Sequence, residues 1–207
     1  LAPLLLILYL CIGFIPNWQA VDKIAPQWLG MSLLNFLSLF YFFFKRISLA
    51  YSLSLTLKSS MTLTYMGFIL WAIGSLAYAI NPTEVIVNLS RQLNVFLMFF
   101  SMAVFLFSFK NKLRFIPWVI TLILGVELYA VLNEALEMIN TSGAISSGTL
   151  KGVTANRNIT AFSIAIKIPF VLFLIHLEKK IWKKLVLAAL VTLGLIALSM
   201  IQSRASF

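Results

Sequence analysis

The sequence predicts an all-α integral membrane protein, a bundle of about seven spanning helices whose N-terminus is cytoplasmic. First, 61% of its 207 residues are hydrophobic and only 11% are charged, whereas soluble domains carry roughly 25% charged residues. Second, the apolar residues form long continuous runs without the alternation of membrane strands, so helices are the expected elements. Third, the basic residues are concentrated in alternate connections between these runs.

Seven apolar runs are each close to the roughly 20 residues that a helix needs to cross a bilayer. The predicted spans are residues 1–15, 28–44, 61–80, 92–109, 115–136, 159–177 and 185–201. The sequence begins inside an apolar run at Leu1 and stops abruptly at Phe207, soon after the last run. We therefore expect residues 1–207 to be a single transmembrane helical domain, truncated at both ends.

The Lys and Arg residues predict the orientation, because cytoplasmic loops are enriched in them. One set of connections contains Lys45, Arg46, Lys58, Lys110, Lys112, Arg114, Lys179, Lys180, Lys183 and Lys184. The opposite set contains Lys23, Arg91, Lys151, Arg157 and Arg204. The richer set is predicted to be cytoplasmic. The net charge of +10 is then explained by membrane topology, and no nucleic-acid partner is expected.

Three of the basic residues on the opposite side are arginines at the ends of predicted spans. They are Arg91, Arg157 and Arg204. A guanidinium group is a planar fork of donors that suits phosphate, so these residues are candidate phosphate ligands. The alternative is that they extend to lipid headgroups as ordinary interfacial residues.

Polar residues inside two neighbouring spans suggest a contact between them. Thr160, Ser163 and Lys167 of the 159–177 span share one helical face with Asn156, which lies just before it. Glu127, in the preceding span, lies at about the same depth as Lys167. Since an unpaired ion inside a membrane is costly, we predict that Glu127 and Lys167 form an ion pair. The pair could be functional, or it could only fix the packing of the two helices.

Metal and cofactor chemistry is not expected. Cys11 is the only cysteine, and it is predicted to be a small apolar core residue. His176 is the only histidine and lies at the opposite end of its span from the polar cluster. No His, Cys or Asp cluster has the spacing of a metal site.

Two motifs resemble those of the O-antigen ligase and polymerase family. The segment GVTANRNITAF is similar to the Gly-x-x-x-Asn-x-Asn-x-x-Ala signature, matched by Gly152, Asn156, Asn158 and Ala161. The segment LSMIQSRASF is similar to the family's Ser-Arg-small motif, matched by Ser203, Arg204 and Ala205. The resemblance extends over about residues 71–207.

The resemblance implies a glycosyltransferase of the bacterial inner membrane, within a larger GT-C-like transmembrane domain. Such enzymes transfer a glycan from undecaprenyl pyrophosphate to lipid A core, to a growing polysaccharide or to a protein at the outer face. The expected partners are thus the lipid-linked glycan, its acceptor and membrane lipids, without a cofactor. Arg204 matches the position implied to hold pyrophosphate, whereas Arg157 and Arg91 match it less closely. The family's catalytic histidine would lie beyond residue 207, with Glu134 or Glu137 as the alternative base.

Two other function classes remain open. In a transporter or flippase, Glu127 and Lys167 would line an ion or substrate pathway. In a membrane scaffold, the same residues would only hold the helices together. The sequence predicts neither the sugar nor the acceptor.

Overall fold

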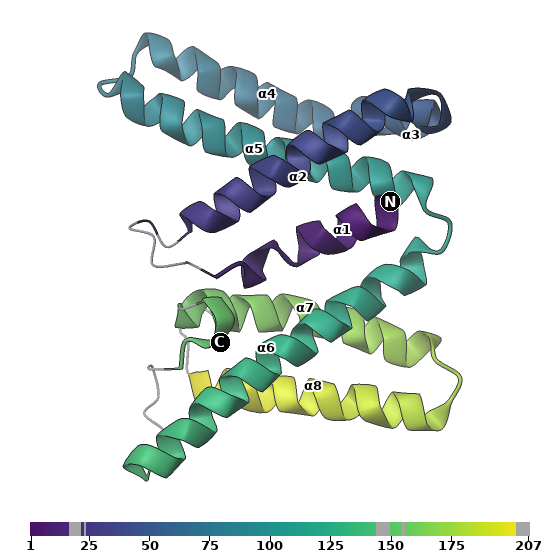
Figure 1. The fold of residues 1–207 in the computed structure, drawn as a ribbon, viewed down its shortest axis with the longest axis vertical. Helices are drawn as coiled ribbons and strands as arrows, with labels where there is room; N and C mark the ends of the chain where they lie inside the picture. Colours follow the sequence, from purple (N-terminus) through teal and green to yellow (C-terminus); the bar gives the residue numbers. More distant parts are fainter. Residues whose placement is uncertain (17–21, 23, 144–149, 155, 202–207) are drawn as a thin grey trace. The chain divides into compact units, whose positions relative to one another are not determined.

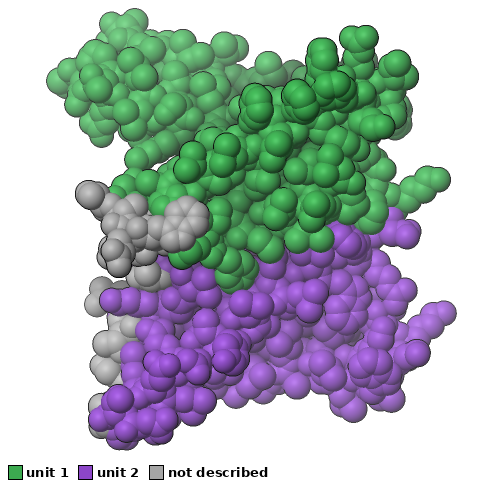
Figure 2. Space-filling model, viewed as in Figure 1, with its two compact units in different colours: residues 1–110 green, residues 111–207 purple. Residues whose placement is uncertain are grey.

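The computed structural model describes residues 1–16, 22, 24–143, 150–154 and 156–201 (Figure 1). The chain divides into two compact units, Leu1–Lys110 and Asn111–Phe207, which are described separately below (Figure 2). Every regular element in the described residues is helical. The predicted all-α class is therefore confirmed, whereas the single domain over residues 1–207 stays a prediction.

Six helices in the described part of the chain are long and apolar enough to cross a membrane. They are Ala25–Phe44, Ser60–Ala77, Pro82–Ser108, Lys112–Thr141, Arg157–Leu177 and Ile181–Ile201. Residues 1–15, predicted as a further span, form the nine-residue helix α1 (Ala2–Leu10) and a 3-10 turn (Ile12–Phe14). At 1.5 Å per residue α1 is about 13 Å long, less than half the thickness of a hydrocarbon core.

The first unit is organised around α5 (Pro82–Ser108), which packs against α1, α2 (Ala25–Phe44), α3 (Arg46–Lys58) and α4 (Ser60–Gly74). In Figure 1, α4 and α5 run antiparallel and α2 crosses α5. Aromatic rings fill part of this contact: Phe42 of α2 lies 5.3 Å from Phe105 of α5, centroid to centroid. Val104 and Phe105 are almost completely buried.

Helix α3 occupies a segment that was predicted to be a loop. Leu49, Ser52 and Thr56 are its buried residues, and their spacing places them on one helical face. Two of these three side chains are small, which allows close helix packing. Thr56 also satisfies its hydroxyl by donating to the Ser52 carbonyl at 2.9 Å. A polar but well-packed face explains why hydropathy alone did not reveal this helix.

Helix α5 begins ten residues before the predicted start at Gln92. The reason is a local start signal: Asn81 accepts a hydrogen bond from the Glu84 backbone N–H at 3.2 Å, and Pro82 occupies the first helical position. At 27 residues, α5 is about 40 Å long. Arg91 therefore lies inside α5 and not at its start.

The second unit contains α6 (Lys112–Ser142), α7 (Arg157–Leu177) and α8 (Ile181–Ile201). Helices α7 and α8 lie side by side and antiparallel, and α6 packs across both (Figure 1). Leu124, Leu128 and Val131 form the buried stripe of α6. Gly194 of α8 faces Ile168 of α7, since a Cβ at this glycine would lie in ordinary van der Waals contact with the Ile168 Cδ1 atom, 3.5 Å away. This apolar core fixes the register of the polar residues on α6 and α7.

Candidate functional site

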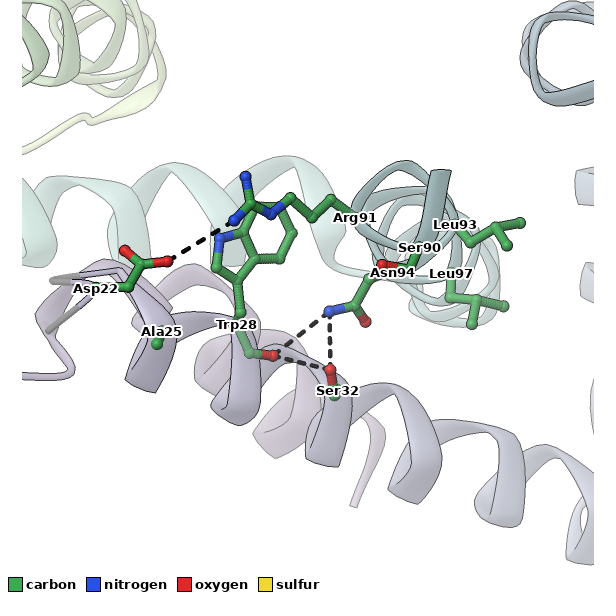
Figure 3. Close-up of a pocket in the computed structure, with 9 residues that line it drawn as sticks. All are labelled: Asp22, Ala25, Trp28, Ser32, Ser90, Arg91, Leu93, Asn94 and Leu97. Carbon is green, nitrogen blue, oxygen red and sulfur yellow. Dashed lines mark hydrogen bonds and ion pairs between the residues drawn. The ribbon is translucent and has the colours of Figure 1, made fainter. Parts of the chain in front are cut away.

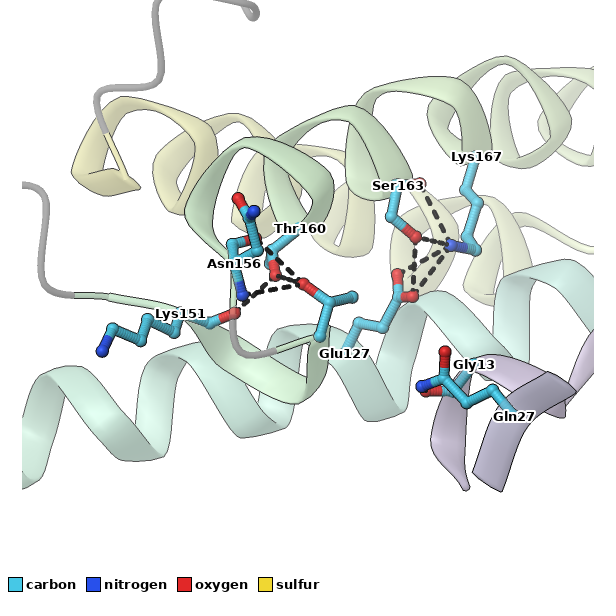
Figure 4. Close-up of polar contacts among 9 residues, drawn as sticks. Gly13, Gln27, Glu127, Lys151, Asn156, Thr160, Ser163 and Lys167 are labelled. Atoms are coloured by element: carbon cyan, nitrogen blue, oxygen red, sulfur yellow. Dashed lines mark hydrogen bonds and ion pairs between the residues drawn. The ribbon is translucent and has the colours of Figure 1, made fainter. Parts of the chain in front are cut away.

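The predicted ion pair between α6 and α7 is present in the structure (Figure 4). The Lys167 ammonium donates to both carboxylate oxygens of Glu127, each at 2.9 Å. Ser163 completes a cluster of three, since its hydroxyl donates to Glu127 Oε1 at 2.8 Å and also contacts the Lys167 ammonium. The Lys167 ammonium also donates to the Ser163 carbonyl at 3.1 Å. We call Glu127, Ser163 and Lys167 the charged cluster.

The charged cluster is buried far from the helix ends. Glu127 is at the midpoint of α6, about 22 Å from either end, and Lys167 is about 15 Å inside α7. Their side chains are 8% and 16% exposed. Desolvating two ions is unfavourable unless the geometry and further hydrogen bonds offset that cost. Here the bidentate contact and Ser163 provide those bonds, so the cluster can exist at this depth.

A segment between α6 and α7 covers one end of the polar face. Glu134 of α6 accepts the backbone N–H groups of Lys151 and Gly152 on one oxygen, at 2.9 and 2.8 Å. Gly152 has φ +55°, and an added Cβ would lie 2.9 Å from Val131 and 3.0 Å from Thr160. Glycine is therefore required both by the backbone conformation and by the available space.

Thr160 connects this segment to α7. Its side chain is buried, its hydroxyl donates to the Lys151 carbonyl at 2.5 Å, and it lies 2.6 Å from the Thr154 hydroxyl. The predicted polar face of α7 is thus buried at Thr160 and at the charged cluster. Figure 4 shows the Lys151 side chain directed away from these contacts.

Asn156 is the N-cap of α7. Its side-chain oxygen accepts the backbone N–H groups of Asn158 at 3.0 Å and of Ile159 at 3.5 Å. Arg157, the first residue of α7, is exposed, and Ala161 is completely buried. The motif residues therefore have clear local roles, and together they present Arg157 at a helix N-terminus. Ser203, Arg204 and Ala205 lie outside the described residues.

Arg91 lines an open pocket of about 530 Å³ in the first unit (Figure 3). Its guanidinium lies 3.7 Å from the Asp22 carboxylate and 5.9 Å from the centroid of the Trp28 ring. It was predicted as a ligand for pyrophosphate at the start of a span. The structure instead places it about three turns into α5, beside a carboxylate that opposes the binding of a strongly anionic group.

A second polar network in the first unit was not predicted. Asn35 of α2 donates to the Asn94 backbone carbonyl at 2.8 Å and accepts from the Tyr9 hydroxyl at 2.8 Å. Tyr9 also lies 2.9 Å from the Ser38 hydroxyl, and Asn94 donates to Ser32 at 2.9 Å. We call these five side chains the neutral network. A sequence signal existed, because Ser32, Asn35 and Ser38 recur at helical spacing in an otherwise apolar run.

The sequence alone did not indicate a structural role for Glu178, the residue after α7. Its carboxylate accepts from the Arg114 guanidinium at 2.8 Å and lies 3.7 Å from the Lys183 ammonium. The hydrogen bond from Arg114 is the main reason that the pKa of Glu178 is below its usual range. Burial acts in the opposite direction, and the charges of Arg114 and Lys183 lower the pKa further. Glu178 thus ties the start of α6 to the turn between α7 and α8.

The other candidate residues are not brought together. Glu137 accepts a hydrogen bond from Asn133 on its own helix at 2.8 Å, and His176 lies exposed in the last turn of α7. Within residues 1–16, 22, 24–143, 150–154 and 156–201, no group of three or more His, Cys, Asp or Glu side chains could hold a metal ion.

The apolar helices define the chain as a multi-pass membrane protein. No protein family, curated protein or solved structure matches it. Its more specific assignment therefore depends on the residues themselves.

Proposed function

We propose that the chain is part of an enzyme that transfers a glycan from undecaprenyl pyrophosphate to an acceptor at the extracytoplasmic face of the bacterial inner membrane. The acceptor would be lipid A core, a growing polysaccharide or a protein. The observation that carries the proposal is the construction around Gly152 and Asn156. These two residues of the motif that resembles the O-antigen ligase and polymerase family fix the backbone from which exposed Arg157 projects.

The chemistry of the donor is consistent with this arrangement. When the glycosidic bond breaks, both bonding electrons go to the pyrophosphate oxygen, which becomes strongly anionic. A guanidinium at the positive end of a helix dipole stabilises such charge as it develops. Arg157 would serve this role from α7, with Arg204 as a second donor inferred from the resemblance.

The acceptor hydroxyl must lose its proton as it attacks the sugar carbon, so a base is required. One oxygen of Glu134 is occupied by the backbone N–H groups of Lys151 and Gly152. This supports a positioning role for Glu134 rather than that of the base. The proposal therefore keeps the histidine implied by the family resemblance as the base.

The test compares Arg157→Ala with Lys151→Ala in the full-length protein in its native membrane. Both variants remove an exposed basic side chain, one from the segment before α7 and one from the first residue of α7, but only Arg157 is proposed to contact pyrophosphate. We expect Arg157→Ala to slow glycan transfer about 100-fold, the usual effect of losing one charge-stabilising donor. Lipid-linked glycan should accumulate in the outer leaflet, and Lys151→Ala should behave like the wild type. Equal transfer rates in all three proteins would contradict the proposal.

A transporter or flippase is the second candidate, supported by the charged cluster in the middle of α6 and α7. Buried ionisable residues inside membrane helices commonly belong to substrate or ion pathways. The same experiment separates the two functions. Delivery of the glycan to the outer leaflet is measured with a membrane-impermeant oxidant in Arg157→Ala and in the double variant Glu127→Gln, Lys167→Met, which removes both charges of the cluster together. If either stops delivery while the protein stays folded, transport replaces transfer as the function.

A further inference from the structure

The pocket around Arg91 has a chemistry that the transfer reaction does not use. Its described lining residues all belong to the first unit and lie around the start of α2 and within residues 90–97 of α5. Its polar lining residues are Asp22, Trp28, Ser32, Ser90, Arg91 and Asn94. Figure 3 shows Arg91 reaching across Trp28 toward Asp22.

Both charged groups of the pocket remain accessible. The side chains of Arg91 and Asp22 are 44% and 50% exposed, and their closest atoms are 3.7 Å apart. This distance is too long for a direct hydrogen bond. The other Asp22 oxygen accepts the Ile24 backbone N–H at 3.1 Å, which holds the carboxylate in place. The pocket thus presents one positive and one negative group side by side, with an indole ring beneath the guanidinium.

This pair of charges selects the kind of ligand. Asp22 would repel a pyrophosphate, and Arg91 would repel a simple cation. A zwitterion with a phosphate next to a primary ammonium satisfies both groups. The phosphate would accept from the Arg91 guanidinium, and the ammonium would donate to the Asp22 carboxylate.

The pocket lining is charged and polar at one end and apolar at the other, which matches the headgroup and acyl chain of a phospholipid. Asp22 precedes α2 and Trp28 lies in its first turn, and a Trp residue is typical of a membrane interface; Arg91 reaches both residues from α5. Leu93 and Leu97 line the same pocket one turn apart on α5, farther from the N-terminus of that helix than Arg91. An acyl chain that follows these leucines would keep its headgroup beside Arg91 and Asp22.

We propose that this pocket binds the headgroup of a phospholipid that carries a primary ammonium, of the phosphatidylethanolamine class. Arg91 recognises the phosphate and Asp22 recognises the ammonium. Lipid binding in this pocket does not depend on the proposed glycan transfer, because the ligand is a membrane lipid and the pocket contains neither Arg157 nor the charged cluster.

The experiment measures lipid binding to the purified full-length protein in detergent by native mass spectrometry. The probes are phosphatidylethanolamine, phosphatidylglycerol and phosphatidylcholine with identical acyl chains. We expect the wild type to bind phosphatidylethanolamine about fivefold more tightly than the other two, a preference in the range of a half-exposed ion pair. Asp22→Asn should remove the preference while retaining binding, and Arg91→Gln should weaken binding of all three lipids.

Arg46→Gln is the matched control, since Arg46 is an exposed arginine at the start of α3, outside the pocket. It should leave the preference for phosphatidylethanolamine intact. Thermal unfolding of each variant verifies that the fold is retained. Equal binding of the three lipids by the wild type would overturn the proposal, as would an unchanged preference in Asp22→Asn. If soluble phosphoethanolamine displaced the lipid at the same concentration, the ligand would be the free headgroup compound and not a membrane lipid.

Discussion

Both units bury polar side chains among apolar helices, but they do so with different chemistry. The first unit uses the neutral network, in which Asn35 connects α1, α2 and α5 through amide and hydroxyl groups. The second uses the charged cluster, in which Glu127 and Lys167 neutralise each other. Truncating one member of a neutral network leaves a dipole to be satisfied, whereas truncating one member of an ion pair leaves an uncompensated charge. The two units should therefore respond very differently to single substitutions.

The largest effect is expected for Glu127→Gln. It leaves the Lys167 ammonium buried without a counter-ion, which should lower the free energy of unfolding by about 3–5 kcal/mol. The double variant Glu127→Gln, Lys167→Met should recover most of this loss. Steric trapping or denaturation in mixed micelles measures the difference.

Glu137→Gln is the control for Glu127→Gln, because Glu137 is exposed near the end of the same helix. It should change the free energy of unfolding by no more than about 0.5 kcal/mol. If the double variant were as unstable as Glu127→Gln alone, the two charges would not stabilise each other and the comparison of the units would fail.

Gly152→Ala tests whether the second unit also depends on the segment that covers its polar face. The left-handed backbone and the contacts with Val131 and Thr160 should together lower the free energy of unfolding by about 2–3 kcal/mol. Gly143→Ala is the matched control, since Gly143 has φ +70° but open space around its Cα. The difference between the two variants measures the packing contribution, and equal losses would mean that only the backbone matters.

Asn35→Leu probes the neutral network and should have a smaller effect, about 1–2 kcal/mol in the free energy of unfolding. The reason is that its partners keep other bonds: Tyr9 retains Ser38, and Asn94 retains Ser32. Asn88→Leu, at an exposed position of α5, is the control. A loss as large as that of Glu127→Gln would break the distinction between the two units.

The smallest effect is expected for Glu178→Gln, and it should depend on pH. Because the pKa of Glu178 is lowered in the folded state, its ionised form stabilises the protein above the pKa of the unfolded chain. This contribution is lost as pH falls through the lowered pKa. The variant should therefore unfold at a lower temperature than the wild type at neutral pH, and the difference should shrink in acid. A difference in unfolding temperature that is constant with pH would contradict this role.

The sequence was sufficient to predict the ion pair, because two opposite charges at equal depth in adjacent apolar runs have few other ways to be satisfied. It was not sufficient for the neutral network. Asn35 meets Tyr9 and Asn94 from 26 and 59 residues away in the chain, and a lone amide in an apolar run does not reveal its partner.

Local signals also decided how well the helices were predicted. Hydropathy found the apolar part of α5 but not its first ten residues, which depend on the cap at Asn81 and on Pro82. It missed α3, whose buried face includes Ser52 and Thr56. Residue type alone offered both Asn156 and Asn158 as caps of α7, and the distances show that Asn156 is the N-cap. Arg204, the predicted pyrophosphate ligand, lies outside the described residues and stays a prediction.

The position of the charged cluster has a consequence for how the protein is made. Glu127 leaves the ribosome 40 residues before Lys167, a delay of about 2–8 s at ordinary rates of synthesis. During that interval α6 has no counter-ion for Glu127, and a central carboxylate carries an apparent insertion cost of about 2.5–3.5 kcal/mol. The leucines, isoleucines and valines of α6 offset this cost until α7 arrives. Because of this order of synthesis, α6 is made with an unpaired Glu127, and α7 later supplies the Lys167 ammonium that neutralises it.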